Sequence, residues 1–72
     1  MIKIAERLRD LRKEQHVTQQ SVADYLGIKV RTYQYYEGNG HRPDYETLVK
    51  LADFFDVTTD YLLGRSDERG IQ

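Results

Sequence analysis

The fold is decided by residues 18–37, which read TQQSVADYLGIKVRTYQYYE. Thr18 offers a side-chain oxygen of the kind that caps a helix start, and the apolar positions after it predict a helix over residues 18–26. Gly27 follows directly, where a left-handed residue ends a helix at little steric cost. A second short helix is predicted over residues 29–37. The stretch therefore predicts two short helices joined by a glycine turn.

Two helices joined in this way are typical of a DNA-reading helix-turn-helix. The helical period divides the second helix into two faces. Its inward face, suited to packing, would hold Thr32, Tyr33 and Tyr36. Its outward face, suited to a DNA groove, would hold Val30, Arg31, Gln34 and Tyr35.

The rest of the chain predicts three more helices, so we expect an all-α fold of five helices. A first helix, ending near Gln15, follows from the apolar spacing of Ile4, Leu8 and Leu11. A fourth begins after Asp44 and a fifth runs over residues 58–63. Residues 1–64 would form the DNA-binding domain, and residues 65–72 a polar C-terminal tail that frays.

Composition narrows the class of protein. Seventy-two residues make one domain. The chain has no cysteine and no apolar run near the ~20 residues of a membrane span, so we expect a cytoplasmic protein that needs no membrane. His16 and His41 are far apart and lack metal-ligand spacing. With no glycine-rich phosphate loop or nucleophile elbow either, we expect no enzyme, no metal and no cofactor.

Charge is divided along the chain. Residues 1–36 hold seven Lys or Arg against four Asp or Glu, whereas residues 37–72 hold four against eight, and the formal net charge is −1. The predicted reading helix therefore lies in the positive half. Because the whole chain is not basic, non-specific DNA affinity should be weak, and specific contacts should carry more of the binding. Chance also produces uneven surfaces of this size.

Lys29 is unusual at the start of the second helix of the unit. Its ammonium cannot accept a hydrogen bond from an amide, and it puts positive charge at the positive end of the helix dipole. One interpretation is drift, because a missing cap costs only about 1 kcal/mol. The other is that a DNA phosphate normally sits beside this helix start.

Over residues 2–64 the chain resembles the Cro/C1-type helix-turn-helix domains of lambdoid phage repressors and XRE-like bacterial regulators. The resemblance rests on an ordered set of motifs: RLRDLR at 7–12, TQQSVADYLG at 18–27, YEG at 36–38, RP at 42–43, LVKLA at 48–52 and DYLLG at 60–64. It implies a compact, lambda-repressor-like domain whose third helix enters the major groove, and in most members binding as a two-fold dimer.

The resemblance also implies roles for individual residues. Val30, Arg31, Gln34 and Tyr35 match base-facing positions, and Gln19 matches a phosphate contact that opens the second helix. Asn39, His41 and Arg42 match a loop that follows the phosphates, and Lys29 is added as a phosphate contact on the argument above. Arg12 and Glu37 match a structural ion pair between the first and third helices.

The chemistry of the outward face can be argued separately. Arg31 can make a bidentate contact to guanine, or it can be a solvated arginine or a phosphate contact. Gln34 suits adenine or a phosphate, and Val30 could meet a thymine methyl or be partly buried. Tyr35 could stack on a sugar or bond a phosphate. These roles are left open by the sequence.

The leading hypothesis is a sequence-specific regulator of transcription, a repressor that binds a two-fold symmetric operator in double-stranded DNA as a homodimer. The dimer surface would involve the fifth helix and the Phe54–Leu63 region, since Phe54 lies off the apolar stripe of its helix. The alternative is an antitoxin-like or adaptor module, in which the acidic second half binds a protein partner and DNA contact is secondary.

Overall fold

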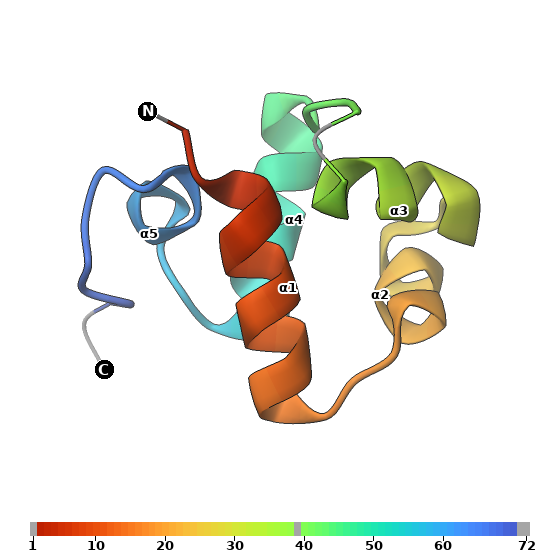
Figure 1. Ribbon diagram of the computed structural model, residues 1–72, viewed down its shortest axis with the longest axis horizontal. Coiled ribbons are helices and arrows are strands. Elements are labelled where there is room, and N and C mark those ends of the chain that lie inside the picture. The colour runs from red at the N-terminus through yellow and green to blue at the C-terminus, as the bar shows by residue number, and fades with distance from the viewer. Residues whose placement is uncertain (1, 39, 71–72) are drawn as a thin grey trace.

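The computed structural model describes residues 2–38 and 40–70, and within them the chain forms five helices and no strand. The helices are α1 (Ile4–Gln15), α2 (Gln19–Leu26), α3 (Val30–Glu37), α4 (Tyr45–Phe55) and α5 (Thr59–Leu63). In Figure 1, α2 and α3 lie on one side of the central α1, and α5 lies on the other. The predicted all-α architecture is confirmed.

The helix starts follow the capping residues read from the sequence. Thr18 Oγ1 accepts from the backbone N–H of Ser21 at 3.0 Å. Asp44 and Thr58 accept equivalent bonds three residues on, at 2.8 and 3.0 Å. Lys29 occupies the same position before α3 without a side-chain cap bond. Each capping bond satisfies an N–H that the first turn of a helix would otherwise leave unpaired.

The turn between α2 and α3 favours glycine because of its backbone conformation, and not because a larger side chain would collide with a neighbour. Gly27 has φ +73° and ends α2, and its N–H donates to the carbonyls of Ala23 and Asp24. A Cβ added at Gly27 would meet nothing within 4 Å. Glycine is therefore favoured here because the left-handed region is costly for other residues.

The core lies where α1, α2, α3 and α4 meet, and α5 closes one end of it. Its largest fully buried side chains come from every helix: Leu8, Leu11, Val22, Tyr33, Leu51, Phe55 and Leu62. Tyr33 is the inward residue of α3 with no exposed surface, so burial of its ring fixes the rotation of that helix. The opposite face of α3 is thereby turned outward.

Phe54 lies off the apolar stripe of α4, yet it is not freely exposed. It is partly buried against the core, and its ring centroid lies 5.0 Å from that of Tyr25. Tyr25 from α2 remains about half exposed and covers one side of the Phe54 ring. The apolar stripe of α4 gave no sign of this partner, because Tyr25 approaches from a different helix.

The tail also differs from its expected fraying. Residues 65–70 fold back over α1 and α5, on the side of the molecule away from α3 (Figure 1). Arg7 donates to Asp67 at 2.8 Å, and Arg69 pairs with Glu14 through two bonds, one of them 2.7 Å. Asp67, Arg69 and Glu14 are exposed, so solvent screens both pairs and each stabilises the segment only slightly.

Candidate nucleic-acid interface

The outward face of α3 carries the polar side chains that were expected to read DNA. Arg31, Gln34 and Tyr35 are exposed there, whereas Tyr33 and Glu37 are buried on the opposite side. Val30 is partly buried and packs against the core. The sequence left open whether Val30 meets a thymine methyl or is partly buried, and in the free protein it is partly buried.

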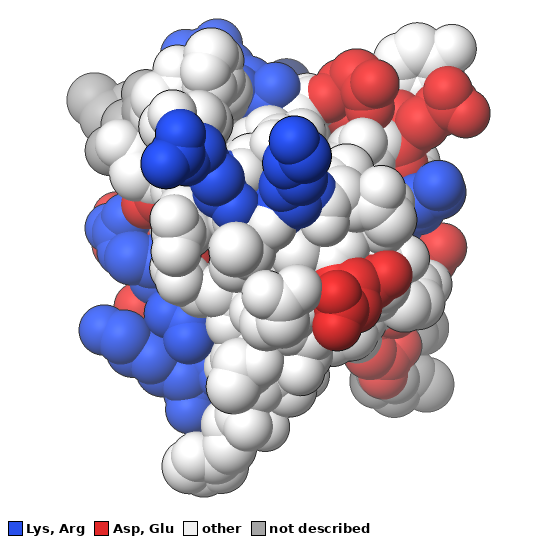
Figure 2. Space-filling model, turned by 90° about the vertical axis from the view of Figure 1, so that its right-hand side faces the viewer, with Lys and Arg blue, Asp and Glu red and all other residues white. Residues whose placement is uncertain are grey.

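Charge is distributed unevenly around this face. Figure 2 looks onto the side formed by α2 and α3, where Lys or Arg side chains stand isolated on a mainly uncharged surface. More Lys and Arg gather along one edge of the view, and Asp and Glu gather along the opposite edge. A polyanion laid across this face would be attracted to the basic edge and repelled at the acidic one.

A buried ion pair fixes the end of α3 to α1. Arg12 Nε donates to Glu37 Oε2 at 2.8 Å and Arg12 Nη2 donates to Oε1 at 3.2 Å. The Glu37 side chain is 4% exposed and that of Arg12 is 18% exposed. Such a two-point contact holds orientation as well as distance. Arg9, also from α1, donates to the backbone carbonyl of Glu37 and so satisfies the last turn of α3.

The same carboxylate is linked to the outward face through two amides. Gln19 Nε2 donates to Glu37 Oε1 at 3.2 Å, and Gln34 Nε2 donates to Gln19 Oε1 at 3.1 Å. The path thus runs from α1 through Glu37 and Gln19 to Gln34. Gln34 is exposed, and its amide is held in the free protein by Gln19, which is in turn bonded to the buried Glu37. Gln19 was expected to contact a phosphate, but its side-chain N–H and carbonyl oxygen form these two hydrogen bonds within the protein.

The ion pair sets the protonation state of its members. Burial alone would raise the pKa of Glu37, but hydrogen bonds from Arg12 and Gln19 and the nearby Tyr33 hydroxyl outweigh it and lower that pKa. The hydrogen bond to Glu37 likewise raises the pKa of Arg12. Burial, with the carboxylate beside it, raises the pKa of Tyr33. Both members of the pair are charged at neutral pH.

A lowered pKa at Glu37 makes stability depend on pH in one direction. The stabilisation should be complete above the ordinary glutamate pKa of about 4.3 and should be lost as pH falls through the lower folded value. We expect Glu37→Gln to unfold more easily than wild type near neutral pH, with the difference narrowing in acid. Urea titrations of both proteins between about pH 7 and pH 3 would measure this. A difference that stays constant across that range would contradict it.

The loop residues expected at phosphates stand at one end of the α3 face. His41 and Arg42 are exposed, as is Lys29 at the other end of α3. Asn39, the third loop residue in that expectation, lies outside the residues that the structure describes. The His41 ring contacts Tyr35, with ring centroids 4.9 Å apart and planes at 70°. Lys29, His41 and Arg42 therefore place positive or ionisable groups at both ends of the helix.

Sequence reasoning missed Arg9 as part of this site. In the sequence, Arg9 stands among several charged residues of the first helix. Its spacing from Arg12 was the available signal, because residues three apart lie on the same helix face. The acceptor is a backbone carbonyl, which leaves no mark in the sequence.

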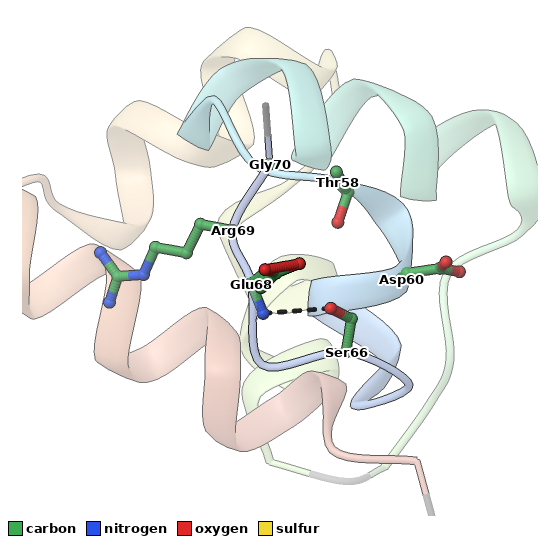
Figure 3. A pocket seen from close by; sticks show the side chains of 6 residues that line it. All are labelled: Thr58, Asp60, Ser66, Glu68, Arg69 and Gly70. Atoms are coloured by element: carbon green, nitrogen blue, oxygen red, sulfur yellow. Dashed lines mark hydrogen bonds between the residues drawn. The ribbon is translucent and has the colours of Figure 1, made fainter. Parts of the chain in front are cut away.

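A shallow hollow lies away from the α3 face, between α5 and the folded-back tail. It is lined by Thr58, Asp60, Ser66, Glu68, Arg69 and Gly70 (Figure 3). The Arg69 guanidinium points out of it, and the Glu68 N–H is bonded to Ser66 Oγ at 3.0 Å. The hollow contains no residue that the sequence linked to DNA.

No helix in residues 2–38 or 40–70 has the length and apolar character needed to cross a membrane.

Two short helices at a glycine turn, with the second held face-out by α1 and α2, define a helix-turn-helix domain. A family model described as Helix-turn-helix matches residues 8–62, and the chain belongs to this family. A solved transcriptional regulator from Listeria innocua superposes with a TM-score of 0.85 at 32% sequence identity. That match covers 100% of this chain and 63% of the other.

Bacterial and phage regulators are similar in sequence. The HTH-type transcriptional regulator AnsR of Bacillus subtilis is 47% identical over 64 residues, which cover 89% of this chain and 55% of AnsR. YqaE of the same organism, an uncharacterized HTH-type transcriptional regulator, is 44% identical over 69 residues, 94% of this chain and 60% of YqaE. The CTXphi transcriptional repressor RstR of Vibrio cholerae is 42% identical, covering 89% and 57%. The chain thus spans little more than half of these relatives.

Proposed function

We propose that residues 1–64 are a sequence-specific double-stranded DNA-binding domain that regulates transcription as a repressor in the cytoplasm. The observation that carries the proposal is the outward face of α3, where Arg31 and Gln34 are exposed while Glu37 is anchored beneath them. Arginine and glutamine have the donor patterns that match guanine and adenine in the major groove. The names of AnsR and RstR, a regulator and a phage repressor, support this class of function.

The residues divide by the kind of contact they would make. Arg31 and Gln34 would read base edges, with the methyls of Val30 beside them. Lys29 and Arg42, at the two ends of α3, would contact phosphates and set the register of the helix on the duplex. Gln19 would act mainly through Gln34, because its amide is already bonded to Gln34 and Glu37.

Selection of bound duplexes from a random DNA pool tests the proposal directly. A sequence-specific domain should enrich a defined half-site, and its affinity for that site should fall steeply as salt rises. A scrambled duplex of the same length and composition is the control. If no DNA sequence is enriched and the protein instead captures a protein partner independently of salt, the antitoxin-like or adaptor alternative would be supported.

We also propose that two copies bind together on a two-fold symmetric site. One helix-turn-helix contacts few base pairs, so useful affinity needs a second copy. The selected site should then contain two inverted half-sites with centres about 10 base pairs, or ~34 Å, apart. Sedimentation of the protein with and without the selected duplex would give the stoichiometry. A single half-site bound by one copy would contradict this prediction.

A further inference from the structure

Tyr35 is the residue through which α3 is joined to the loop that follows it. The backbone N–H groups of Gly38, Gly40 and His41 all point to the Tyr35 carbonyl, at 3.2, 3.0 and 3.4 Å. The last of these is long for a hydrogen bond, and the first two are of ordinary length. The loop therefore turns around the Tyr35 backbone and returns alongside its side chain.

The Tyr35 ring is held by the same loop. His41 meets it edge to face, with centroids 4.9 Å apart. On the backbone side, a Cβ built on Gly40 would lie 3.4 Å from Tyr35 Cδ1, so Gly40 itself is close against the ring. Tyr35 keeps 44% of its surface exposed. One part of the ring is packed on the loop and the rest is open to solvent.

This packing separates Tyr35 from the other outward residues of α3. Gln34 is oriented by α2, through Gln19, whereas Tyr35 is oriented by the loop on its other side. Because the Tyr35 ring packs against the loop, it lies beside whatever ligand the loop contacts. Under the proposed function, on which this step rests, the loop follows the sugar-phosphate backbone.

We infer that His41 is a positioning residue for the DNA interface: its ring holds Tyr35, and Tyr35 makes a sequence-independent contact to the DNA backbone. This replaces two separate roles, a phosphate contact at His41 and base reading at Tyr35, with one unit. The imidazole acts as an aromatic ring rather than through charge. An aromatic pair of this geometry changes an equilibrium constant by about 2- to 10-fold.

Three variants at one position separate the aromatic contact from the charge. His41→Ala removes both, His41→Phe keeps an aromatic ring, and His41→Lys keeps a cation without a ring. His41 is exposed, so all three should fold. Ring-proton shifts of Tyr35 in the free protein report the contact itself. They should move in His41→Ala and His41→Lys and return toward wild type in His41→Phe.

Affinity for the selected duplex and its single-base variants gives the second readout. His41→Ala and His41→Lys should lose about 2- to 10-fold on every duplex alike, and His41→Phe should recover most of that loss. Retained affinity in His41→Lys with loss in His41→Phe would overturn the inference and make His41 a direct phosphate contact. A loss confined to one base position would also overturn it, because Tyr35 would then read a base.

The two readouts distinguish failure of this inference from failure of the proposed function. Tyr35 shifts that respond as expected, with no duplex bound by wild type, would contradict the proposed function and with it the DNA role of His41. Duplex binding with Tyr35 shifts unchanged in His41→Ala would leave the proposed function in place and overturn the inference.

Discussion

Replacing Arg12 with alanine should lower the free energy of unfolding by about 3–5 kcal/mol. The substitution leaves the Glu37 carboxylate, 4% exposed, without the guanidinium that makes two hydrogen bonds to it. Desolvation of that charge would then be only partly offset, because the Gln19 amide and the nearby Tyr33 hydroxyl carry no positive charge. A small domain is typically stable by about 5–15 kcal/mol, so the variant should be marginal. Urea unfolding followed by circular dichroism measures the effect.

Arg65 offers a matched control for this experiment. It pairs with Asp60 at 3.9 Å, but both side chains are mostly exposed, at 76% and 64%. Removing an arginine from such a pair should cost no more than about 1 kcal/mol. Both variants remove one positive charge, so the comparison isolates the burial and the hydrogen-bond geometry of the pair that is broken. Equal losses in Arg12→Ala and Arg65→Ala would show that the Arg12–Glu37 pair contributes no more than a surface pair does.

A double variant separates the net value of the pair from the cost of breaking it. Arg12→Met combined with Glu37→Met removes both charges, and apolar replacement of a buried pair is often close to neutral. We expect the double variant to be more stable than Arg12→Ala alone. DNA affinity should nevertheless fall in it, since Gln19 and Gln34 lose the carboxylate that orients them.

Local signals explain why the helices were predictable. Thr18, Asp44 and Thr58 cap helices by bonds to residues three positions away, and Gly27 ends α2 within its own turn. Each of these features is decided within a few residues, so spacing and residue type suffice. The Arg12–Glu37 pair spans 25 positions and came instead from the resemblance to a family, because periodicity alone cannot choose a partner at that distance.

Contacts between distant segments account for what the sequence did not predict. The tail looked free because its partners are 55 to 60 positions away, as in Arg69–Glu14 and Arg7–Asp67. The Gln19–Gln34 bond likewise depends on the angle between α2 and α3, which neither residue type specifies. Contacts of this kind follow from the packed arrangement of the helices, so they can be read only once that arrangement is known.

The low net charge of the chain makes the choice between base and backbone contacts important. With a formal charge of −1 overall, a few basic residues must supply most of the attraction to phosphates. Arg31 lies at the start of α3 on its outward face, and Arg42 lies in the loop just before Pro43. Residues near the start of a reading helix reach base edges, whereas loop residues follow the backbone. Replacing each of the two arginines should therefore impair DNA binding in a different way.

Arg31→Ala should cost about 1–3 kcal/mol of binding free energy on the preferred site and relax selection at one base pair, where guanine is expected. Arg42→Ala should weaken all duplexes to a similar extent and reduce the salt slope by about one unit. Affinity measured against single-base variants of the selected site, at several salt concentrations, separates the two patterns. Arg65→Ala is again the control, because it removes the same charge just after α5, a helix that lies on the other side of α1 from α3 (Figure 1). If Arg31→Ala weakens every sequence equally, Arg31 contacts a phosphate, and base reading would fall to Gln34.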